Sequence, residues 1–299
     1  MTLDDLMYKP GLLAGRRYLV TGGGSGLGRV MSEALVLLGA TVYICGRREG
    51  VLEETARELS AAAGPQGGRA LAVGCDIRKE EQIAQMLDRI WADGGALDGL
   101  VNNAAGNFVS RTEDLSPRGF DAIANIVFRG SFMTTLDCGK RWLAEGRSAA
   151  VVSIVTTWVW NGSAFTVPSA MSKAGLHAMT QSLAVEWAGR GIRFNAIAPG
   201  LFPTEGMSAR LNPGGGEHKA EGNPMERTGR MPELANLAVL LLGPGADYIN
   251  GQTIAIDGGQ YQATGGNFSR MRSWGDADWQ RARENIAGQD AKDRRARLA

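Results

Sequence analysis

The sequence predicts an α/β fold, a doubly wound parallel sheet of seven strands with helices on both faces. Short apolar segments alternate with longer amphipathic segments along the chain, and strict alternation of strands with helices is typical of parallel sheets. The apolar segments, such as YLVT at 18–21 and TVYIC at 41–45, are almost continuously apolar rather than alternating. Continuous apolar strands are expected when helices cover both faces of the sheet.

Branched and aliphatic side chains dominate each expected strand, which is the composition that favours extended backbone. In chain order the expected strands are Tyr18–Thr21, Thr41–Cys45, Ala70–Gly74, Gly99–Asn102, Ala149–Val155, Arg193–Ala198 and Thr253–Asp257. Between the strands, apolar residues recur at the spacing of an amphipathic helix. In chain order the expected helices are Leu27–Leu38, Val51–Ala63, Glu80–Trp91, Pro117–Leu143, Ala170–Ala188 and Pro232–Leu242.

One domain over residues 1–299 is expected, because no early Pro- or Gly-rich linker divides the chain and no internal repeat is present. Leu201–Met231 is rich in Gly and Pro and joins a strand to a helix. A connection of that length is typically functional or disordered, and we expect a substrate-side loop there. Residues 260–299 are expected to form a C-terminal extension, with a helix near Asp276–Ile286 and a frayed, charged end.

The composition argues against several classes of partner. A formal net charge of +1 gives no electrostatic reason to expect nucleic acid or an anionic membrane. The three cysteines, Cys45, Cys75 and Cys138, are too few and too scattered for a disulfide framework or a metal cluster, so no metal is expected. The N-terminus is unlike a secretory signal, and no segment approaches the roughly 18 apolar residues of a membrane span. A cytoplasmic protein is expected.

A glycine-rich turn follows the first strand and opens the first helix. The strand RRYLVT leads directly into Thr21, Gly22, Gly23, Gly24, Ser25, Gly26, Leu27 and Gly28. Glycines allow the backbone to approach a pyrophosphate closely, and the helix N-terminus then offers free N–H groups and a positive dipole end. In this strand–turn–helix context the pattern predicts a Rossmann-type dinucleotide site.

The end of the second strand predicts which dinucleotide binds. A fold that takes NAD often places Asp or Glu there, whereas this chain has Arg47 and Arg48. A guanidinium forms a charge-assisted fork with the 2′-phosphate of NADP, so NADP(H) is favoured. The alternative is that both arginines are solvated charges at a strand end. Asp76 and Ile77, after the third strand, would suit a contact with the adenine edge.

Several motifs together resemble the short-chain dehydrogenase/reductase family. They are the glycine pattern of Thr21–Gly28, the NNAAG of Asn102–Gly106, the NAIAPG of Asn195–Gly200 and the final GQT…DGG of 251–259. Within that family, NNAAGNF, FTVPSAMSK at Phe165–Lys173, RLNP at 210–213 and the tail from GGNF to Trp279 are similar to the 2,4-dienoyl-CoA reductase branch. The resemblance covers residues 12–260 in order, with the tail in addition.

The resemblance implies a substrate, a cofactor and an assembly. It implies NADPH-dependent reduction of the conjugated double bond of an enoyl- or 2,4-dienoyl-CoA thioester. It also implies a homotetramer, with Pro117–Leu143 and Ala170–Ala188 at the expected interface. Lys173 would hold the nicotinamide ribose, and Asn107 would bind the thioester oxygen. The residues implied to line the cofactor are Gly22–Leu27, Arg47, Asp76, Asn103, Ala104, Ala105, Pro199, Gly200, Leu201 and Phe202. The residues implied to contact the CoA substrate are Arg78, Phe108, Ser116 and Arg210.

The chain departs from the family at its tyrosine. The wider family uses Tyr-x-x-x-Lys, but Ser169 stands four residues before Lys173. The dienoyl branch has its Tyr fifteen residues before the Lys, where this chain has Trp158, and Thr156 occupies the family's Ser/Thr position. An indole N–H donates a hydrogen bond but cannot transfer a proton as a phenol does. Carbonyl reduction would therefore lose general-acid help worth about 10²–10⁴-fold.

Conjugate reduction of a thioester is less affected by this loss. Its charge builds on the thioester oxygen as an enolate, which hydrogen-bond donors stabilise without transferring a proton. Asn107, with Thr157 or the Trp158 N–H and the charge of Lys173, could serve. His177 lies on the same helix face as Lys173 and is a hypothetical proton relay or an ordinary packed histidine.

Two other functions stay open. One is an alcohol/ketone oxidoreductase of the same family with a non-tyrosine acid. The other is a catalytically inactive NADP(H)-binding protein.

Overall fold

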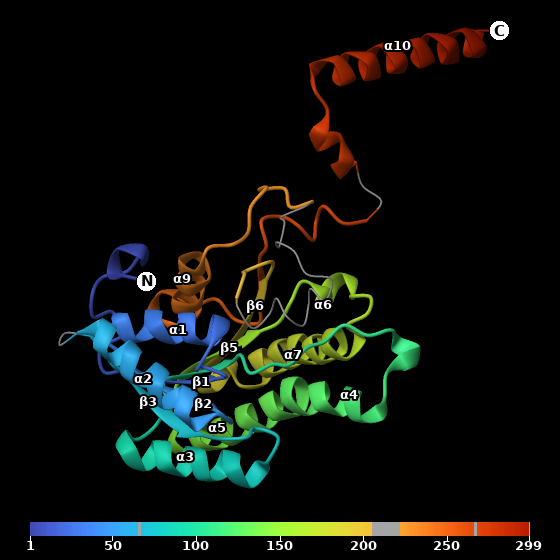
Figure 1. Cartoon of the computed structure of the whole chain (residues 1–299). Coiled ribbons are helices and arrows are strands. Elements are labelled where there is room, and N and C mark those ends of the chain that lie inside the picture. Colours follow the sequence, from blue (N-terminus) through green and yellow to red (C-terminus); the bar gives the residue numbers. More distant parts are fainter. Residues whose placement is uncertain (65–66, 205–221, 266–267, 299) are drawn as a thin grey trace.

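Seven parallel strands form the centre of the molecule. The computed structural model describes residues 1–64, 67–204, 222–265 and 268–298 (Figure 1). The strands are β1 (Arg17–Thr21), β2 (Thr41–Gly46), β3 (Arg69–Gly74), β4 (Gly99–Asn102), β5 (Ala149–Ile154), β6 (Ile192–Pro199) and β7 (Thr253–Ile256). They pair in parallel in the order β3-β2-β1-β4-β5-β6-β7. The predicted fold class is confirmed, and each strand lies within two residues of its expected bounds.

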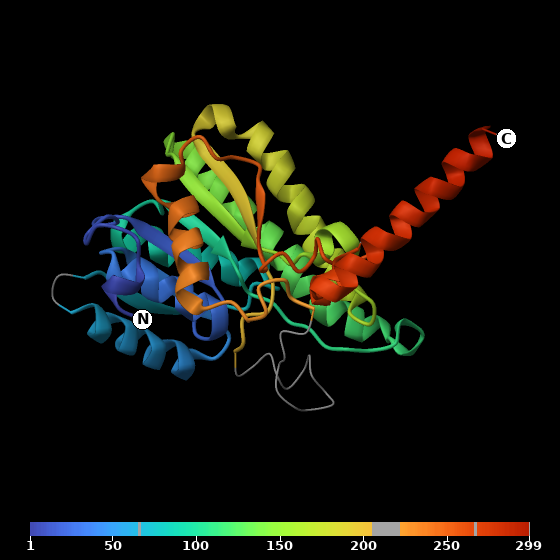
Figure 2. The ribbon, with the colours of Figure 1, turned by 90° about the horizontal axis from the view of Figure 1, so that it is seen from above.

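Helices cover both faces of the sheet (Figures 1 and 2). They are α1 (Gly26–Leu37), α2 (Glu49–Ala63), α3 (Glu80–Gly94), α4 (Pro117–Ala124), α5 (Ser131–Glu145), α6 (Trp158–Asn161), α7 (Val167–Glu186), α9 (Met231–Leu242) and α10 (Asp276–Leu298). Helices α1, α2 and α9 pack on one face, and α3, α5 and α7 pack on the other. No helix in the described ranges is long and apolar enough to cross a membrane.

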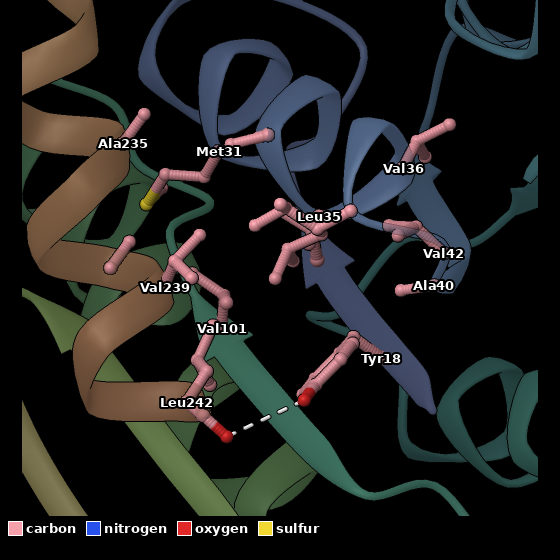
Figure 3. Packing of buried hydrophobic residues seen from close by; sticks show 14 of the residues in the cluster. Tyr18, Met31, Leu35, Val36, Ala40, Val42, Val101, Ala235, Val239 and Leu242 are labelled. Carbon is pink, nitrogen blue, oxygen red and sulfur yellow. Dashed lines mark hydrogen bonds between the residues drawn. The ribbon is translucent and has the colours of Figure 1, made fainter. Parts of the chain in front are cut away.

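The apolar residues of α1 and α9 recur at helical spacing, and they are buried together in the core between these two helices and the sheet. Met31 and Leu35, one turn apart on α1, are fully buried and face Val239 of α9 (Figure 3). The phenol of Tyr18 on β1 donates a hydrogen bond to the carbonyl of Leu242, 3.4 Å away. The buried hydroxyl of Tyr18 therefore has a hydrogen-bond partner, as buried polar groups usually do.

Two helix predictions need correction. Pro117–Leu143 is not one α-helix, because a π-helical segment at Asn125–Gly130 separates α4 from α5. Such segments often lie at functional sites. The charged C-terminal end is not frayed after Ile286, since α10 continues to Leu298 and points away from the sheet (Figures 1 and 2). The ion pair of Arg281 with Asp278 is one of the local pairs that stabilise a helix with no apolar face.

Candidate active site

The glycine turn is packed directly against the loop that follows β4. Gly22 has φ +67°, and a Cβ on it would lie 3.0 Å from the Ala104 Cα. Thr21 Oγ1 accepts hydrogen bonds from the N–H groups of Asn103 and Ala104, both at 3.0 Å. These contacts join the carboxyl ends of β1 and β4, which are neighbours although β2 and β3 separate them in sequence. Ligands bind at such a switch point in doubly wound sheets.

Gly28, the last glycine of the pattern, fixes how closely the start of α1 approaches the turn. A Cβ on Gly28 would lie 2.4 Å from both the Gly22 carbonyl oxygen and Asn103 Nδ2, so only glycine allows α1 to approach the turn this closely. Asn103 Nδ2 donates to the Thr21 carbonyl at 2.9 Å, which gives Asn103 a structural role. Ser25 is the N-cap of α1, but its side chain makes no capping hydrogen bond.

A cleft of about 520 Å³ opens at the carboxyl ends of β2 and β3. Arg47 lines it, and Asp76 lies at its β3 side. This cleft is also lined by two basic residues, Lys79 at the N-cap of α3 and Arg89 in its third turn. Neither was predicted from the sequence. The spacing of Gln82, Gln85 and Arg89 along α3 is the helical signal that places them on one face. The exposed Arg48 is the N-cap of α2.

Asp76 and Arg78, predicted for different ligands, pair with each other. The Arg78 guanidinium donates to Asp76 from Nε at 2.9 Å and from Nη2 at 2.5 Å. These hydrogen bonds hold the pKa of Asp76 below its ordinary value. Ile77 is buried beside them in the core. The Ser116 side chain caps α4 by accepting the Gly119 N–H at 3.1 Å, and Arg210 lies outside the described residues.

Lys173 is buried on the inner face of α7, with 4% of its surface exposed. Its ammonium donates to the carbonyl of Ile154 at the end of β5. Burial lowers the pKa of Lys173 from 10.5 to about 8. Ser169, at the position of the wider family's tyrosine, is also buried. Pro168 in the first turn fixes the start of α7, which holds both side chains at the end of β5.

The segment after β5 carries unpartnered hydrogen-bonding groups. Thr156 Oγ1 is buried and has no hydrogen-bond partner in the described residues. Thr157 is the N-cap of the single-turn helix α6, and Trp158 is its first residue. The Trp158 ring is half-buried. Backbone bonds from Val159 to Thr156 at 3.2 Å and from Gly162 to Trp158 at 2.8 Å fix this turn.

The side-chain amide of Asn107 is oriented by a hydrogen bond with the next residue, Phe108. Its Oδ1 accepts the backbone N–H of Phe108 at 2.9 Å, so the amide presents Nδ2 as a donor. Phe108 and Val159 both pack against the buried cluster around α4 and α7. The exposed Ala105 lies between this residue and the switch point.

The strand end at 199–202 packs against β7. The N–H of Gly200 donates to Ile256 at 3.0 Å, and the carbonyl of Leu201 accepts from Gly229 at 2.9 Å. The Phe202 ring is 2% exposed, so it fills the core beside Gly229 rather than an open surface. Pro199 ends β6.

His177 belongs to an aromatic cluster that the sequence analysis missed. His177 Nδ1 lies 2.8 Å from Thr253 Oγ1, and burial lowers the pKa of the imidazole. The Trp160 ring meets His177 edge-on at 6.4 Å and stacks on Tyr261 at 4.6 Å. Tyr261 follows the last strand, so no sequence pattern near α6 signals it. The proton-relay role of His177 stays a hypothesis.

The residues present fit a nicotinamide dinucleotide. Thr156 Oγ1 is an orphaned buried polar atom, and unpaired buried polar groups are costly unless a ligand or water satisfies them. Arg47 lines its cleft together with the carboxylates of Glu49 and Asp76, and its charge helps to lower the pKa of Asp76. No group of three His, Cys, Asp or Glu residues in the part of the chain that the structure describes could hold a metal.

The chain is similar in sequence and fold to known proteins. A family described as enoyl-(acyl carrier protein) reductase matches residues 22–261. A probable 2,4-dienoyl-CoA reductase of Caenorhabditis elegans is 38% identical, over 96% of this chain and 94% of its own. A short-chain dehydrogenase from Bacillus anthracis has a TM-score of 0.74 and 37% identity, over 82% of this chain and 96% of its own.

A solved structure with a bound cofactor is also similar. A putative 2-deoxy-D-gluconate 3-dehydrogenase from Agrobacterium tumefaciens with bound NADP has a TM-score of 0.75 and 33% identity, over 86% of this chain and 100% of its own. The chain belongs to the short-chain dehydrogenase/reductase family. It is an oxidoreductase that uses a nicotinamide cofactor, as predicted.

Proposed function

We propose that the protein reduces a conjugated double bond of an enoyl- or 2,4-dienoyl-CoA thioester with NADPH. The observation that carries this proposal is a set of hydrogen-bond donors from the loop after β4, the end of β5 and α7. It combines the oriented Asn107 amide, the unpartnered Thr156 hydroxyl and the Lys173 charge with Trp158 in place of a proton-donating tyrosine. Donors of this kind stabilise an enolate oxygen. The relative named as a probable 2,4-dienoyl-CoA reductase supports the same substrate class.

Each residue has one role in the proposed reaction. When bound, the cofactor supplies a hydride to the carbon distant from the thioester. Lys173 holds the nicotinamide ribose and contributes positive charge. Asn107 Nδ2, with the Thr156 or Thr157 hydroxyl or the Trp158 N–H, donates to the thioester oxygen while the negative charge on that oxygen grows. Water then protonates the α-carbon, so no side chain needs to act as the acid.

Comparing substrates in parallel tests this proposal. NADPH oxidation is measured with 2,4-hexadienoyl-CoA, crotonyl-CoA and a simple ketone, with NADH as a control. We expect at least one thioester to be turned over faster than the ketone. Faster turnover of the ketone would instead support the alcohol/ketone oxidoreductase, and Trp158→Tyr should then raise that rate. Tight NADPH binding with no turnover would support the inactive dinucleotide-binding protein.

We further propose that Arg47 selects NADPH over NADH. A charge-assisted hydrogen bond contributes about 1.5–3 kcal/mol, so Arg47→Ala should weaken NADPH binding about 10- to 100-fold and leave NADH binding nearly unchanged. Binding is measured by fluorescence titration. The matched control is Arg57→Ala, an exposed arginine on α2. Equal losses for NADPH and NADH would contradict this assignment.

The homotetramer and the cytoplasmic location also stay proposals. Exposed aromatic side chains support the first, since Phe128 and Phe132 are 47% and 41% exposed in the segment predicted to form the interface. Exposed apolar residues that lie close together often mark a protein–protein contact.

A further inference from the structure

Phe165 has a strained backbone conformation and an exposed apolar side chain, and both features are energetically unfavourable. Its φ is +63°, in the left-handed region, where a Cβ is strained. Its side chain is also 56% exposed, so the ring gains little from burial. Strained residues persist where surrounding structure imposes them, and they concentrate at ligand sites.

The surroundings of Phe165 hold the strained backbone in place. The Phe165 carbonyl accepts the N–H of Ser110 at 2.9 Å. The next residue, Thr166, is buried and its hydroxyl donates to Ser163 Oγ at 2.7 Å. Helix α7 begins immediately afterwards at Val167. The backbone is therefore tethered on both sides, and the ring is held out toward solvent.

Phe165 is joined by a backbone hydrogen bond to the segment that carries Asn107. Ser110 is three residues after Asn107, so the two are separated by at most about 10 Å of extended chain. Val109 is 42% exposed and precedes Ser110, whose N–H donates to the Phe165 carbonyl. Two exposed apolar side chains, Val109 and Phe165, are thus joined to the segment of Asn107, one along the chain and one through a backbone hydrogen bond. Of the residues implied to contact the CoA substrate, Phe108 precedes Val109 on this segment, whereas Arg78 and Ser116 come from other segments, before α3 and at the N-cap of α4.

We propose that Phe165, together with Val109, contacts the acyl chain of the substrate and sets a preference for chains longer than six carbons. The acyl-CoA identity of the substrate rests on the proposed function. An exposed aromatic ring and an exposed valine match an alkyl chain, whereas they do not match the phosphate groups of CoA. Each buried methylene strengthens binding by a factor of about four, so four further carbons give a measurable preference.

The test compares binding of hexanoyl-CoA and decanoyl-CoA, which are not reducible, by titration calorimetry on the full chain. Wild-type protein should bind decanoyl-CoA at least tenfold more tightly than hexanoyl-CoA. Phe165→Gly should reduce that ratio below about threefold while changing hexanoyl-CoA binding little. Phe165→Leu, which keeps an apolar side chain, should retain most of the ratio. The matched control is Tyr248→Gly, because Tyr248 is fully exposed and precedes β7, at the opposite end of the sheet.

Thermal unfolding separates this role from a structural one. Phe165→Gly relieves the positive φ and loses little burial, so its melting temperature should equal or exceed that of wild type. A lower melting temperature with equal losses for both ligands would indicate a packing role and overturn the proposal. An unchanged binding ratio, or no binding of either acyl-CoA by wild type, would also overturn it. If the ratio behaves as expected but 2,4-hexadienoyl-CoA is not reduced, the proposed reaction alone fails.

Discussion

Lys173→Met is expected to lower kcat/KM for thioester reduction about 10³-fold without destabilising the fold. The variant loses the donor for the ribose and the positive charge near the growing enolate, and electrostatic stabilisation of this kind is usually the largest catalytic contribution. Burial lowers the pKa of Lys173 to about 8. Folding therefore disfavours its charged form, by about 1.4 kcal/mol per pKa unit. Methionine removes that penalty, so the melting temperature at pH 7 should not fall.

The same pKa predicts a pH dependence. Lys173 carries its charge below about pH 8 and loses it above, so kcat/KM should decline as the pH rises through 8. The free energy of unfolding depends on pH in the opposite direction to kcat/KM. Between pH 8 and 10.5 the unfolded chain binds the proton that folded Lys173 has released, so this group makes the protein more stable as the pH rises across that range. Arginine stays protonated throughout, so residual activity of Lys173→Arg should show no decline near pH 8. A decline that persists in this variant would assign it to another group.

Asn107→Asp is expected to lower kcat about 10²- to 10³-fold. Removal of a single oxyanion-hole donor typically has an effect of this size. The aspartate keeps the shape and the acceptor for the Phe108 N–H, which lies 2.9 Å from Oδ1. It lacks the Nδ2 donor and places a negative charge beside the enolate. NADPH binding should change less than threefold. Steady-state kinetics measure the effect, and Asn285→Asp on the exposed face of α10 is the matched control. If both variants retain full kcat, Asn107 does not bind the thioester oxygen.

The fold could be predicted from the sequence because buried parallel strands and amphipathic helices leave separate local signals. YLVT and TVYIC became β1 and β2 in parallel register, with Tyr18 paired to Val42. The π-helical segment at Asn125–Gly130 leaves no such signal, because it follows from packing against α7 rather than from local spacing. The length of α10 was missed for another reason. Polar contacts one turn apart, such as Arg281 with Asp278 and Gln280 with Glu284, stabilise it, and a search for apolar periodicity does not detect them.

The site could be predicted only where its residues are adjacent in sequence or match a family motif. The tethering of the glycine turn to Ala104 and the burial of Lys173 agree with those motifs. Contacts between distant segments were missed. The stacking of Tyr261 on Trp160 joins residues about a hundred positions apart. The positive φ of Phe165 is imposed by Ser110 and the start of α7, so its residue type gives no indication of it.

The central claim is that a carbon–carbon double bond is reduced through an enolate, without a tyrosine acid. Reducing 2,4-hexadienoyl-CoA with NADPH in D₂O and locating the label in the product by mass spectrometry tests it most directly. We predict an intact thioester with one solvent-derived deuterium bound to carbon and one unlabelled hydrogen from the cofactor. A control in which unlabelled enoyl-CoA product is incubated with the enzyme in D₂O corrects for background exchange at the α-carbon. NADPH consumption that yields a reduced carbonyl, with no solvent-derived deuterium on carbon, would contradict the claim.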